Sequence, residues 1–250
     1  MNTFRADLHV HTVLSPCADV EMIPPLIVRQ ALEKNIDIIA ITDHNASANV
    51  RAVQKAAEGT ALTVLPGMEV QSREDVHLLA LFENIDILEQ WQLLVDDYLP
   101  ELPNNPEHLG EQFVVDETGE YIRTERRLLL TSTNFSIDGI FERVHGLGGL
   151  VIPAHVERVS YGLFPTLGLI SDDWDVLALE ISRHMSPEKA EAKFPALRKY
   201  PLIQSGDVHL LDEFLGSTLF TLNSPTLMEI RLALHKIDGR GVCIESRTNS

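Results

Sequence analysis

Short apolar runs alternate along this chain with longer stretches in which apolar residues recur at helical spacing. The short runs are typical of buried strands, and the longer ones of helices that cover a sheet. Strands are predicted at Ala6–Val10, Ile36–Ile41, Leu62–Leu65, Val76–Leu81, Leu150–Pro153, Leu177–Ile181 and Leu202–Gln204, with weaker candidates at Leu219–Leu222 and Val242–Ile244. Helices are predicted at Pro25–Lys34, Ala46–Glu58, Ile85–Tyr98, Ile137–Leu147, Pro187–Lys199 and Thr226–His235, with Ser136 and Ser186 as N-caps.

The repeated strand–helix order predicts an α/β fold with parallel strands joined by crossover helices. A closed or distorted barrel is favoured over a doubly wound sheet, with one domain over residues 1–250. Residues 99–133 break the alternation of strands and helices. They contain prolines, asparagines and two short extended runs around a DETG turn. We predict a hairpin-containing excursion there, which serves either as a lid or as an ornament.

Net charge limits the classes of partner. Lys and Arg total 20 against 37 Asp and Glu, which gives a formal net charge of −17. A general nucleic-acid surface is basic, so we expect a small phosphorylated substrate and no long nucleic acid. The start MNTFRADLHVHT lacks a signal-peptide pattern and no run is long enough to span a membrane, so a cytoplasmic protein without membrane contact is expected. Cys17 and Cys243 are expected to be free thiols.

Polar residues gather where the predicted strands end. His9 and His11 are two apart in a strand, so both side chains point to one side, while Leu8 and Val10 are expected to pack outward. Later strands are followed or begun by further acids and imidazoles, namely Asp43, His44, Glu69, His77, His155, Asp207 and His209. Each has an ordinary explanation alone, but together they predict a metal site. Imidazole with carboxylate, and no thiolate, suits zinc, manganese or iron.

The motifs DLHVH, ITDHN, Gly67-x-Glu69, Val76-His77, Pro153-Ala154-His155 and Gly206-Asp207-Val208-His209 resemble, in this order, those of the PHP (polymerase and histidinol phosphatase) superfamily. The stretches SPCADVEMIP and LALEISR are similar to a stand-alone bacterial branch of it. The resemblance implies a distorted (β/α)7 TIM-like barrel with two or three divalent metal ions and phosphoesterase activity.

The resemblance also implies how the ligands divide. His9, His11, Glu69 and Asp207 would hold one ion, and Glu69 would bridge to a second ion held by His77 and His155. The third ion would take Asp19, His44 and His209, with Glu21 as the alternative to Asp19. Asp7 and Asp43 are expected to accept hydrogen bonds from imidazoles and orient them, or equally to serve as turn or cap residues. Glu180 is a further candidate to support a ligand, and His184 is a candidate to protonate the leaving group or simply a loop residue.

Catalytic candidates are Asp207, His209, Arg158 and Arg183. A guanidinium grips phosphate at two points, although a surface ion pair explains each arginine equally well. The leading prediction is a metal-dependent phosphoesterase for a small phosphorylated metabolite, nucleotide or short oligonucleotide. The alternatives are a metal-dependent hydrolase of a C–N or carboxylic ester bond, and a non-catalytic metal-binding interaction module. Oligomeric state is not predicted.

Overall fold

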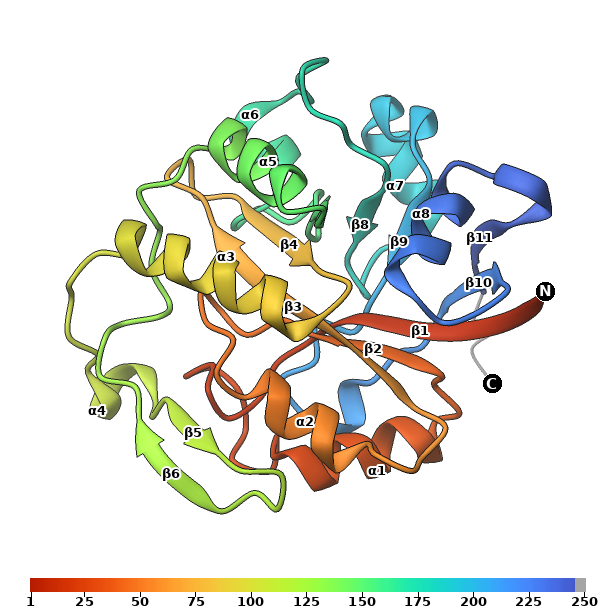
Figure 1. Cartoon of the computed structure of the whole chain (residues 1–250). Coiled ribbons are helices and arrows are strands. Elements are labelled where there is room, and N and C mark those ends of the chain that lie inside the picture. Colours follow the sequence, from red (N-terminus) through yellow and green to blue (C-terminus); the bar gives the residue numbers. More distant parts are fainter. Residues whose placement is uncertain (246–250) are drawn as a thin grey trace.

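The structure is a computed structural model that describes residues 1–245, so the last five residues of the predicted domain lie outside the described part. Most predicted elements are present, in the order shown in Figure 1. The strands are β1 (Asn2–Val10), β2 (Ile38–Ile41), β3 (Thr63–Gln71), β4 (His77–Leu81), β5 (Phe113–Val115), β6 (Tyr121–Thr124), β7 (Leu150–Pro153), β8 (Leu179–Ile181), β9 (Leu202–Gln204), β10 (Thr218–Leu222) and β11 (Gly241–Ile244). The helices are α1 (Pro24–Glu33), α2 (Val50–Ala56), α3 (Ile85–Tyr98), α4 (Pro106–Leu109), α5 (Ile137–Gly146), α6 (Leu163–Leu167), α7 (Pro187–Lys193) and α8 (Leu227–Leu234), with short 3-10 turns η1 (Pro195–Lys199), η2 (Leu211–Glu213) and η3 (Ile237–Gly239).

Seven strands form one sheet in the order β11-β10-β1-β2-β3-β4-β7, and β8 pairs with β9 in parallel. Isolated backbone hydrogen bonds join this pair to the sheet on both sides. Val156 N donates to Glu180 O (2.9 Å), and Val208 N donates to His9 O (3.0 Å). The strands β1 to β4 and β7 to β9 therefore curl into a distorted barrel, while β10 and β11 extend the sheet beyond it. The predicted fold class is confirmed.

The strand β4 departs from the prediction of a parallel sheet, because it runs antiparallel to both β3 and β7. Only residues 72–76 connect β3 to β4, and a parallel crossover needs a dozen residues or more. The link must therefore be a hairpin. As a result, the first residue of β4, His77, lies at the same end of the barrel as the last residues of its neighbours.

A register shift in β1 changes which side chains face the barrel. The pairing of β1 with β2 is irregular between Asp7 and Val10. Leu8 packs in one hydrophobic cluster with Ile38, whereas Val10 belongs to the other cluster, beneath the helices. The prediction that Leu8 and Val10 pack outward together is therefore wrong, because a bulge re-aims the side chains that follow it.

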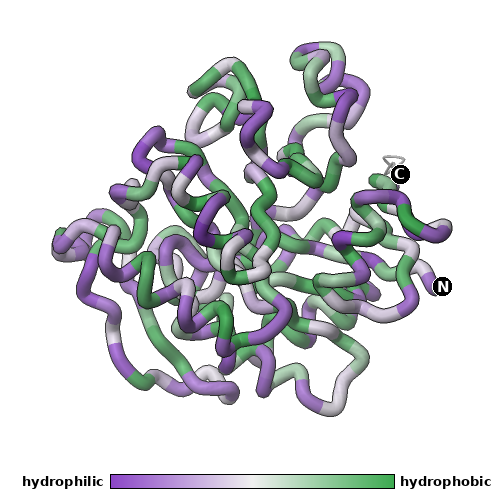
Figure 2. The backbone as a smooth tube through the Cα atoms, turned by 45° about the horizontal axis from the view of Figure 1, so that its top comes forward, coloured by the Kyte–Doolittle hydropathy of each residue, from purple (hydrophilic) through white to green (hydrophobic). Residues whose placement is uncertain are grey.

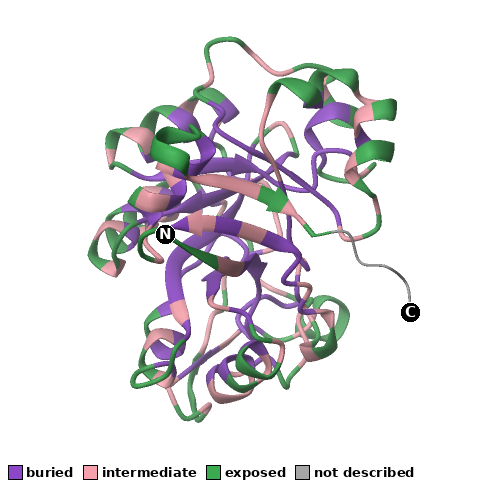
Figure 3. Cartoon of the chain, turned by 90° about the vertical axis from the view of Figure 1, so that its right-hand side faces the viewer, coloured by how far each residue is buried: buried purple, intermediate pink, exposed green. Residues whose placement is uncertain are grey.

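Two hydrophobic layers support this arrangement. Apolar faces of α1, α2, α3 and α5 cover the outside of the curved sheet, and residues of β1, β2, β4 and β7 pack with α8 in the second layer. Figure 2 shows apolar residues concentrated in the central strands, and Figure 3 shows that these strands are buried. No helix within residues 1–245 combines the length and apolar character needed to cross a membrane.

Helix boundaries follow local chemistry. Ser136 accepts a hydrogen bond from Gly139 N (3.1 Å) and Ser186 accepts one from Lys189 N (3.4 Å), which confirms both predicted N-caps. The helix predicted at Pro187–Lys199 instead divides into α7 and η1. It breaks before Pro195, which has no N–H to donate and whose ring clashes with the preceding turn.

The excursion at residues 99–133 contains α4 and the predicted hairpin, β5 and β6. Asp116 Oδ1 accepts hydrogen bonds from Thr118 N (2.9 Å) and Glu120 N (3.0 Å), which closes the DETG turn. Asn49 ties the hairpin to the barrel by donating to Phe113 O (2.9 Å) and accepting from Val115 N (3.0 Å).

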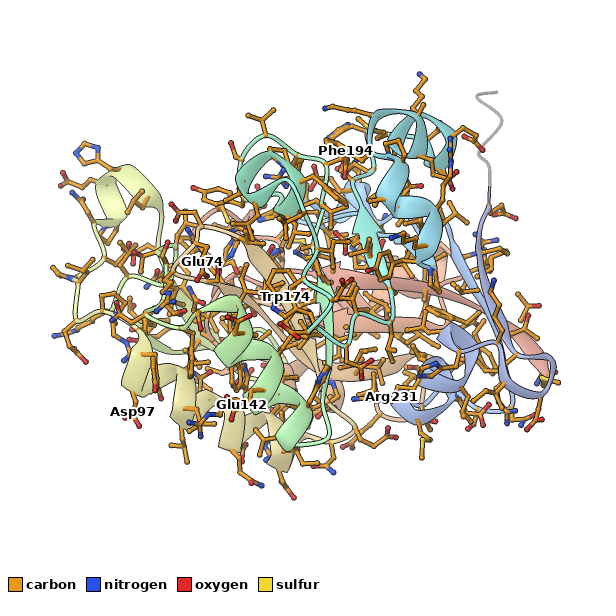
Figure 4. The ribbon with its side chains drawn as sticks, turned by 90° about the horizontal axis from the view of Figure 1, so that it is seen from above. Glu74, Asp97, Glu142, Trp174, Phe194 and Arg231 are labelled. Carbon is orange, nitrogen blue, oxygen red and sulfur yellow. The ribbon has the colours of Figure 1, made fainter. Side chains whose placement is uncertain are left out.

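The segment before β8 packs back over α5. Trp174, labelled in the view from above in Figure 4, stacks on Phe141 with ring centroids 5.5 Å apart. Its indole N–H also donates to Asp138 in the first turn of α5 (2.6 Å). Together these contacts fix one wall of the barrel between β7 and β8.

Two of the glycines between the end of α5 and the start of β7 have different surroundings. A Cβ added to Gly149 would lie 2.5 Å from the ring of Phe82 and 2.7 Å from Val144, whereas one added to Gly146 would meet no atom within 4 Å. Gly149 thus lets β7 approach the helix layer closely.

We predict that Gly149→Ala lowers the free energy of unfolding by about 1–3 kcal/mol, because the added methyl overpacks a full site. Gly146→Ala is the matched control, and it should raise stability by up to about 1 kcal/mol because it removes backbone freedom from the unfolded chain. Urea denaturation of the two variants measures both values. Equal stability of the two variants would contradict the close contact at Gly149.

Candidate metal centre

One buried carboxylate, Glu69 on β3, is surrounded by imidazoles. It is 1% exposed, and all of the contacting nitrogens come from other segments of the chain. Its two oxygens lie close to His77 Nδ1 (2.7 Å), His44 Nδ1 (2.9 Å), His9 Nε2 (3.2 Å), His155 Nε2 (3.2 Å) and His11 Nε2 (3.4 Å). The structure therefore brings together residues that are spread over more than half of the sequence.

The topology explains this convergence. His9, His44 and His155 lie at or just beyond the carboxyl ends of β1, β2 and β7. His77 joins them from the beginning of β4, because that strand runs in the opposite direction. The sequence pattern placed His77 at the start of a strand, whereas the other candidates lie at strand ends. The β3–β4 hairpin explains this difference, because it reverses the direction of β4.

Asp207 and His209 reach the same place from the loop after β9. Asp207 Oδ1 lies 3.3 Å from His9 Nε2, 3.4 Å from His11 Nε2 and 3.5 Å from His209 Nδ1. Asp207 and His155 both have positive φ, at 49° and 31°. Non-glycine residues seldom adopt this conformation, and it is concentrated at functional sites.

Several polar atoms in this cluster are buried without a hydrogen-bond partner. They are His9 Nε2, His11 Nε2, Glu69 Oε2, both nitrogens of His77 and His155 Nδ1. Buried polar atoms are normally paired, so such a concentration calls for an additional partner. Three groups have ligand atoms within 4.8 Å of one another: His11, His44 and His209; His9, His11 and Glu69; and His44, Glu69 and His77. Imidazole and carboxylate donors at this spacing fit divalent cations.

The electrostatics of the cluster are those of a cation site. Burial alone would raise the pKa of Glu69, but the nearby His77, His9 and His44 hold it well below its usual range. Burial would lower the pKa of His9, yet the charges of Glu69, Glu180 and Asp207 raise it well above its usual value. The pKa of Asp207 is also held well below its usual range, so Glu69 and Asp207 remain ionised and favour positive charge between them.

Other imidazoles in the cluster are driven towards the neutral form. Burial is the main cause that lowers the pKa of His77 to about 4, against the opposing charge of Glu69. Burial also lowers the pKa of His11 well below its usual value, with the charges of His209 and His44 acting in the same direction. A neutral imidazole is the form that donates its lone pair to a metal.

Neighbouring acids orient this cluster, and Glu180 was a candidate for this role from the sequence. Glu180 Oε1 lies 3.1 Å from His9 Nδ1. Asp43 acts through Ser15, whose hydroxyl donates to it (2.7 Å) and lies 2.9 Å from His11 Nδ1.

Asp7 contacts no imidazole and instead accepts hydrogen bonds from the backbone of Gly206 (2.9 Å) and Leu215 (2.8 Å). Asp7 therefore does not orient an imidazole, and its contacts agree with the alternative that it serves a turn. Asp7 holds the loop that carries Asp207, because its strand β1 lies beside that loop.

The structure does not bring Asp19 into these groups. Its Oδ1 accepts a hydrogen bond from Glu21 N (2.8 Å), which closes a turn. Cys17, two residues earlier, lies beside His209 and His44 instead. Burial raises the pKa of this thiol, but the neighbouring imidazoles outweigh it and lower the pKa to about 6. Cys17 was expected to be a free thiol without a role at the site. Its closeness in the sequence to the DLHVH motif was the signal that could have placed it there.

Two adjoining cavities open onto the cluster. One of about 190 Å³ is lined by Cys17, His44, Glu69, His77, Leu130, Arg158, Tyr161, Asp207 and His209. The other, of about 460 Å³, shares four of these residues and adds Ser182, Arg183, His184, Gly206 and Glu213. Both predicted arginines therefore lie at the mouth. Arg158 Nη1 bonds to Asp207 Oδ2 (2.5 Å) and Arg183 Nη1 lies 3.2 Å from Glu213 Oε1.

Two features of the mouth were not predicted. The ring of Tyr161 stacks on His77 with centroids 4.4 Å apart and the planes nearly parallel, at 5°. Leu130 brings the end of the excursion to the smaller cavity, whereas Arg123, Arg126 and Arg127 line other hollows. The arginines of the excursion therefore do not reach the cluster.

Curated relatives share part of the chain. It is 35% identical over 86 residues to the 5'-3' exoribonuclease Rnm of Salmonella typhimurium, and 34% identical over 86 residues to Rnm of Escherichia coli. The match covers 32% of this chain and 28% of each relative. The chain thus matches less than a third of the length of these enzymes.

Solved structures resemble nearly the whole chain. The lesion-specific endonuclease Q of Pyrococcus furiosus superposes with a TM-score of 0.72 at 19% identity, over 96% of this chain and 58% of that one. Endonuclease Q bound to a 27-mer duplex with an abasic lesion at the active site gives the same TM-score at 20% identity and the same coverage. A metal-dependent phosphoesterase of Bifidobacterium adolescentis gives a TM-score of 0.54 at 20% identity, over 82% of this chain and 87% of that one.

These relatives contradict the prediction that no long nucleic acid is expected. Rnm is named as an exoribonuclease, and endonuclease Q has been seen on a DNA duplex. The exclusion rested on the net charge of −17, which sums the whole surface. A phosphate meets only the local field, which bound cations can invert. The exclusion was therefore wrong.

The family model described as the PHP domain matches residues 7–166. This range includes the second half of β1 and all of β2 to β4 and β7, together with His9, His11, Glu69, His77 and His155. The curled α/β barrel and the convergence of these side chains agree with that match. The chain therefore belongs to the PHP domain family of metal-dependent hydrolases.

Proposed function

We propose that this PHP domain protein is a phosphoesterase that hydrolyses a phosphoester bond of a nucleotide or nucleic-acid strand, with divalent cations held by the Glu69 cluster. The observation that carries the proposal is a buried carboxylate in contact with five imidazoles. The cavities beside it are also lined by two arginines. Relatives named as ribonuclease, endonuclease and phosphoesterase support the choice of a phosphate ester.

The proposed ligands are His9, His11, Glu69, His77, His155, His44, Asp207 and His209, and their unpartnered atoms supply the donors. When bound, divalent ions lower the pKa of water and withdraw charge from phosphoryl oxygens. Zinc, manganese and iron all suit this donor set, with two or three ions.

The residues of the mouth would bind and orient the substrate. Arg158 and Arg183 each use one nitrogen on an acid, and a guanidinium has further N–H donors that remain for phosphate oxygens. His184 lines the larger cavity and is the candidate donor of a proton to the leaving group. At about 460 Å³ this cavity lies within the range of small-molecule sites, so it has room for a nucleotide unit.

The first test combines metal analysis with turnover. The purified protein should contain two or three equivalents of divalent metal and should hydrolyse an aryl phosphate diester and a 5'-labelled oligonucleotide, with loss of turnover after chelation. Turnover of carboxylic esters or amides in place of phosphates would support the carbonyl-hydrolase alternative. Metal without turnover of either class would favour an interaction module.

Substitution of Glu69 tests the centre directly. Glu69→Gln keeps the shape of the side chain but removes the charge that five imidazoles face, so it should reduce bound metal and lower kcat/KM at least about 100-fold. His108→Gln, at an exposed position on α4, is the control and should change neither quantity. Normal metal content and turnover in Glu69→Gln would refute the proposed centre.

Arg183 tests substrate binding. Arg183→Ala should raise KM for the oligonucleotide roughly 10- to 100-fold, the usual loss for a hydrogen bond to a charged group, with unchanged metal content. The control Arg73→Ala removes an exposed arginine paired with Glu74 and should leave KM unchanged. If Arg183 serves only its pair with Glu213, the thermal stability will fall while KM stays constant.

A further inference from the structure

The turn after β1 places a thiol at the edge of the proposed centre. Cys17 lies at the mouth and lines both cavities beside His209 and Asp207. His44 lines the smaller cavity with it as well. No other described residue between His11 and α1 lines the smaller cavity.

On each of the imidazoles of His44 and His209, one ring nitrogen is already in contact with another group of the protein. His44 Nδ1 is engaged by Glu69 Oε2 (2.9 Å) and His209 Nδ1 by Asp207 O (2.9 Å). These contacts leave Nε2 on each ring for the side of the cavity where Cys17 lies.

A separate observation points to a ligand at this place. His11 Nε2 is fully buried and has no hydrogen-bond partner. The ligand atoms of His11, His44 and His209 all lie within 4.8 Å of one another. A cation placed among these nitrogens would satisfy the buried atom of His11.

The turn itself is held in place. Asp19 N donates to His209 O (2.9 Å) and Ala18 N donates to Ser15 O (2.9 Å). On the outside, Gly110 of the excursion approaches so closely that a Cβ there would lie 2.1 Å from Pro16 O. The carboxylate of Asp19 is meanwhile used within its own turn, on Glu21 N.

We propose that Cys17, and not Asp19, supplies a further protein ligand beside His44 and His209 to one divalent cation of the centre. This inference rests on the proposed function, because it requires a metal centre at this site. The sulfur binds the ion as the thiolate, and any proton that it carries passes to solvent as the sulfur–metal bond forms. A thiolate with two imidazoles selects a thiophilic ion, with zinc favoured over manganese.

Cobalt(II) is the probe that tests this ligand, because a thiolate bound to cobalt gives an intense charge-transfer absorption in the near ultraviolet that oxygen and nitrogen ligands do not give. Metal-free protein titrated with cobalt should develop this band with one equivalent of the bound ions. Cys17→Ser should abolish the band and lower the total bound cobalt by about one equivalent. Cys243→Ser, at the other exposed cysteine, should retain both.

Two further variants separate the ligand from a structural role. Cys17→Asp should restore the bound equivalent without the band, because a carboxylate replaces the thiolate. Asp19→Asn should keep the band. The inference is overturned if Cys17→Ser keeps the band, or if wild-type protein binds cobalt fully without one. Absence of any cobalt binding in the folded wild-type protein would instead overturn the proposed function itself, and this inference with it.

Discussion

The arrangement of side chains at the open end of the barrel depends on the burial of one charged group, the carboxylate of Glu69. An ionised carboxylate removed from water is strongly destabilising unless cations or hydrogen-bond donors surround it. Here β1, β2, β4 and β7 deliver imidazoles to it, and the antiparallel direction of β4 is what brings His77 to the right end. The protein surrounds Glu69 with nitrogens but leaves several of them unpaired, which is the condition that bound cations resolve.

Backbone strain at the site persists because its surroundings hold it. Positive φ at His155 and Asp207 costs roughly 1–3 kcal/mol each. The residue after His155 donates its N–H to Glu180 O, and the residue before Asp207 donates to Asp7. The backbone oxygen of Glu180 and the carboxylate of Asp7 thus hold the loops that carry the cluster. The side chain of Glu180 also contacts His9 within the cluster.

Much of this centre follows from short-range patterns in the sequence. The i, i+2 spacing of His9 and His11 and the acids at strand ends predicted the convergence, and the apolar runs predicted the barrel. The bulge that separates Leu8 from Val10 and the direction of β4 arise from pairing with neighbouring strands. The choice between Cys17 and Asp19 depends on the path of one tight turn. The local periodicity of apolar residues specifies neither the pairing of distant strands nor the path of a turn.

The ion pairs of Arg158 and Arg183 determine how this acidic protein can attract a phosphate substrate. Arg158 is neutralised by Asp207 and Arg183 by Glu213, so these side chains offer phosphate directed hydrogen bonds but little net positive charge. With a formal charge of −17, the surface as a whole repels polyanions at long range. Attraction for phosphate must therefore come from the cations of the centre. The same ions that supply the chemistry then also create the local field that lets an acidic protein approach a nucleic acid.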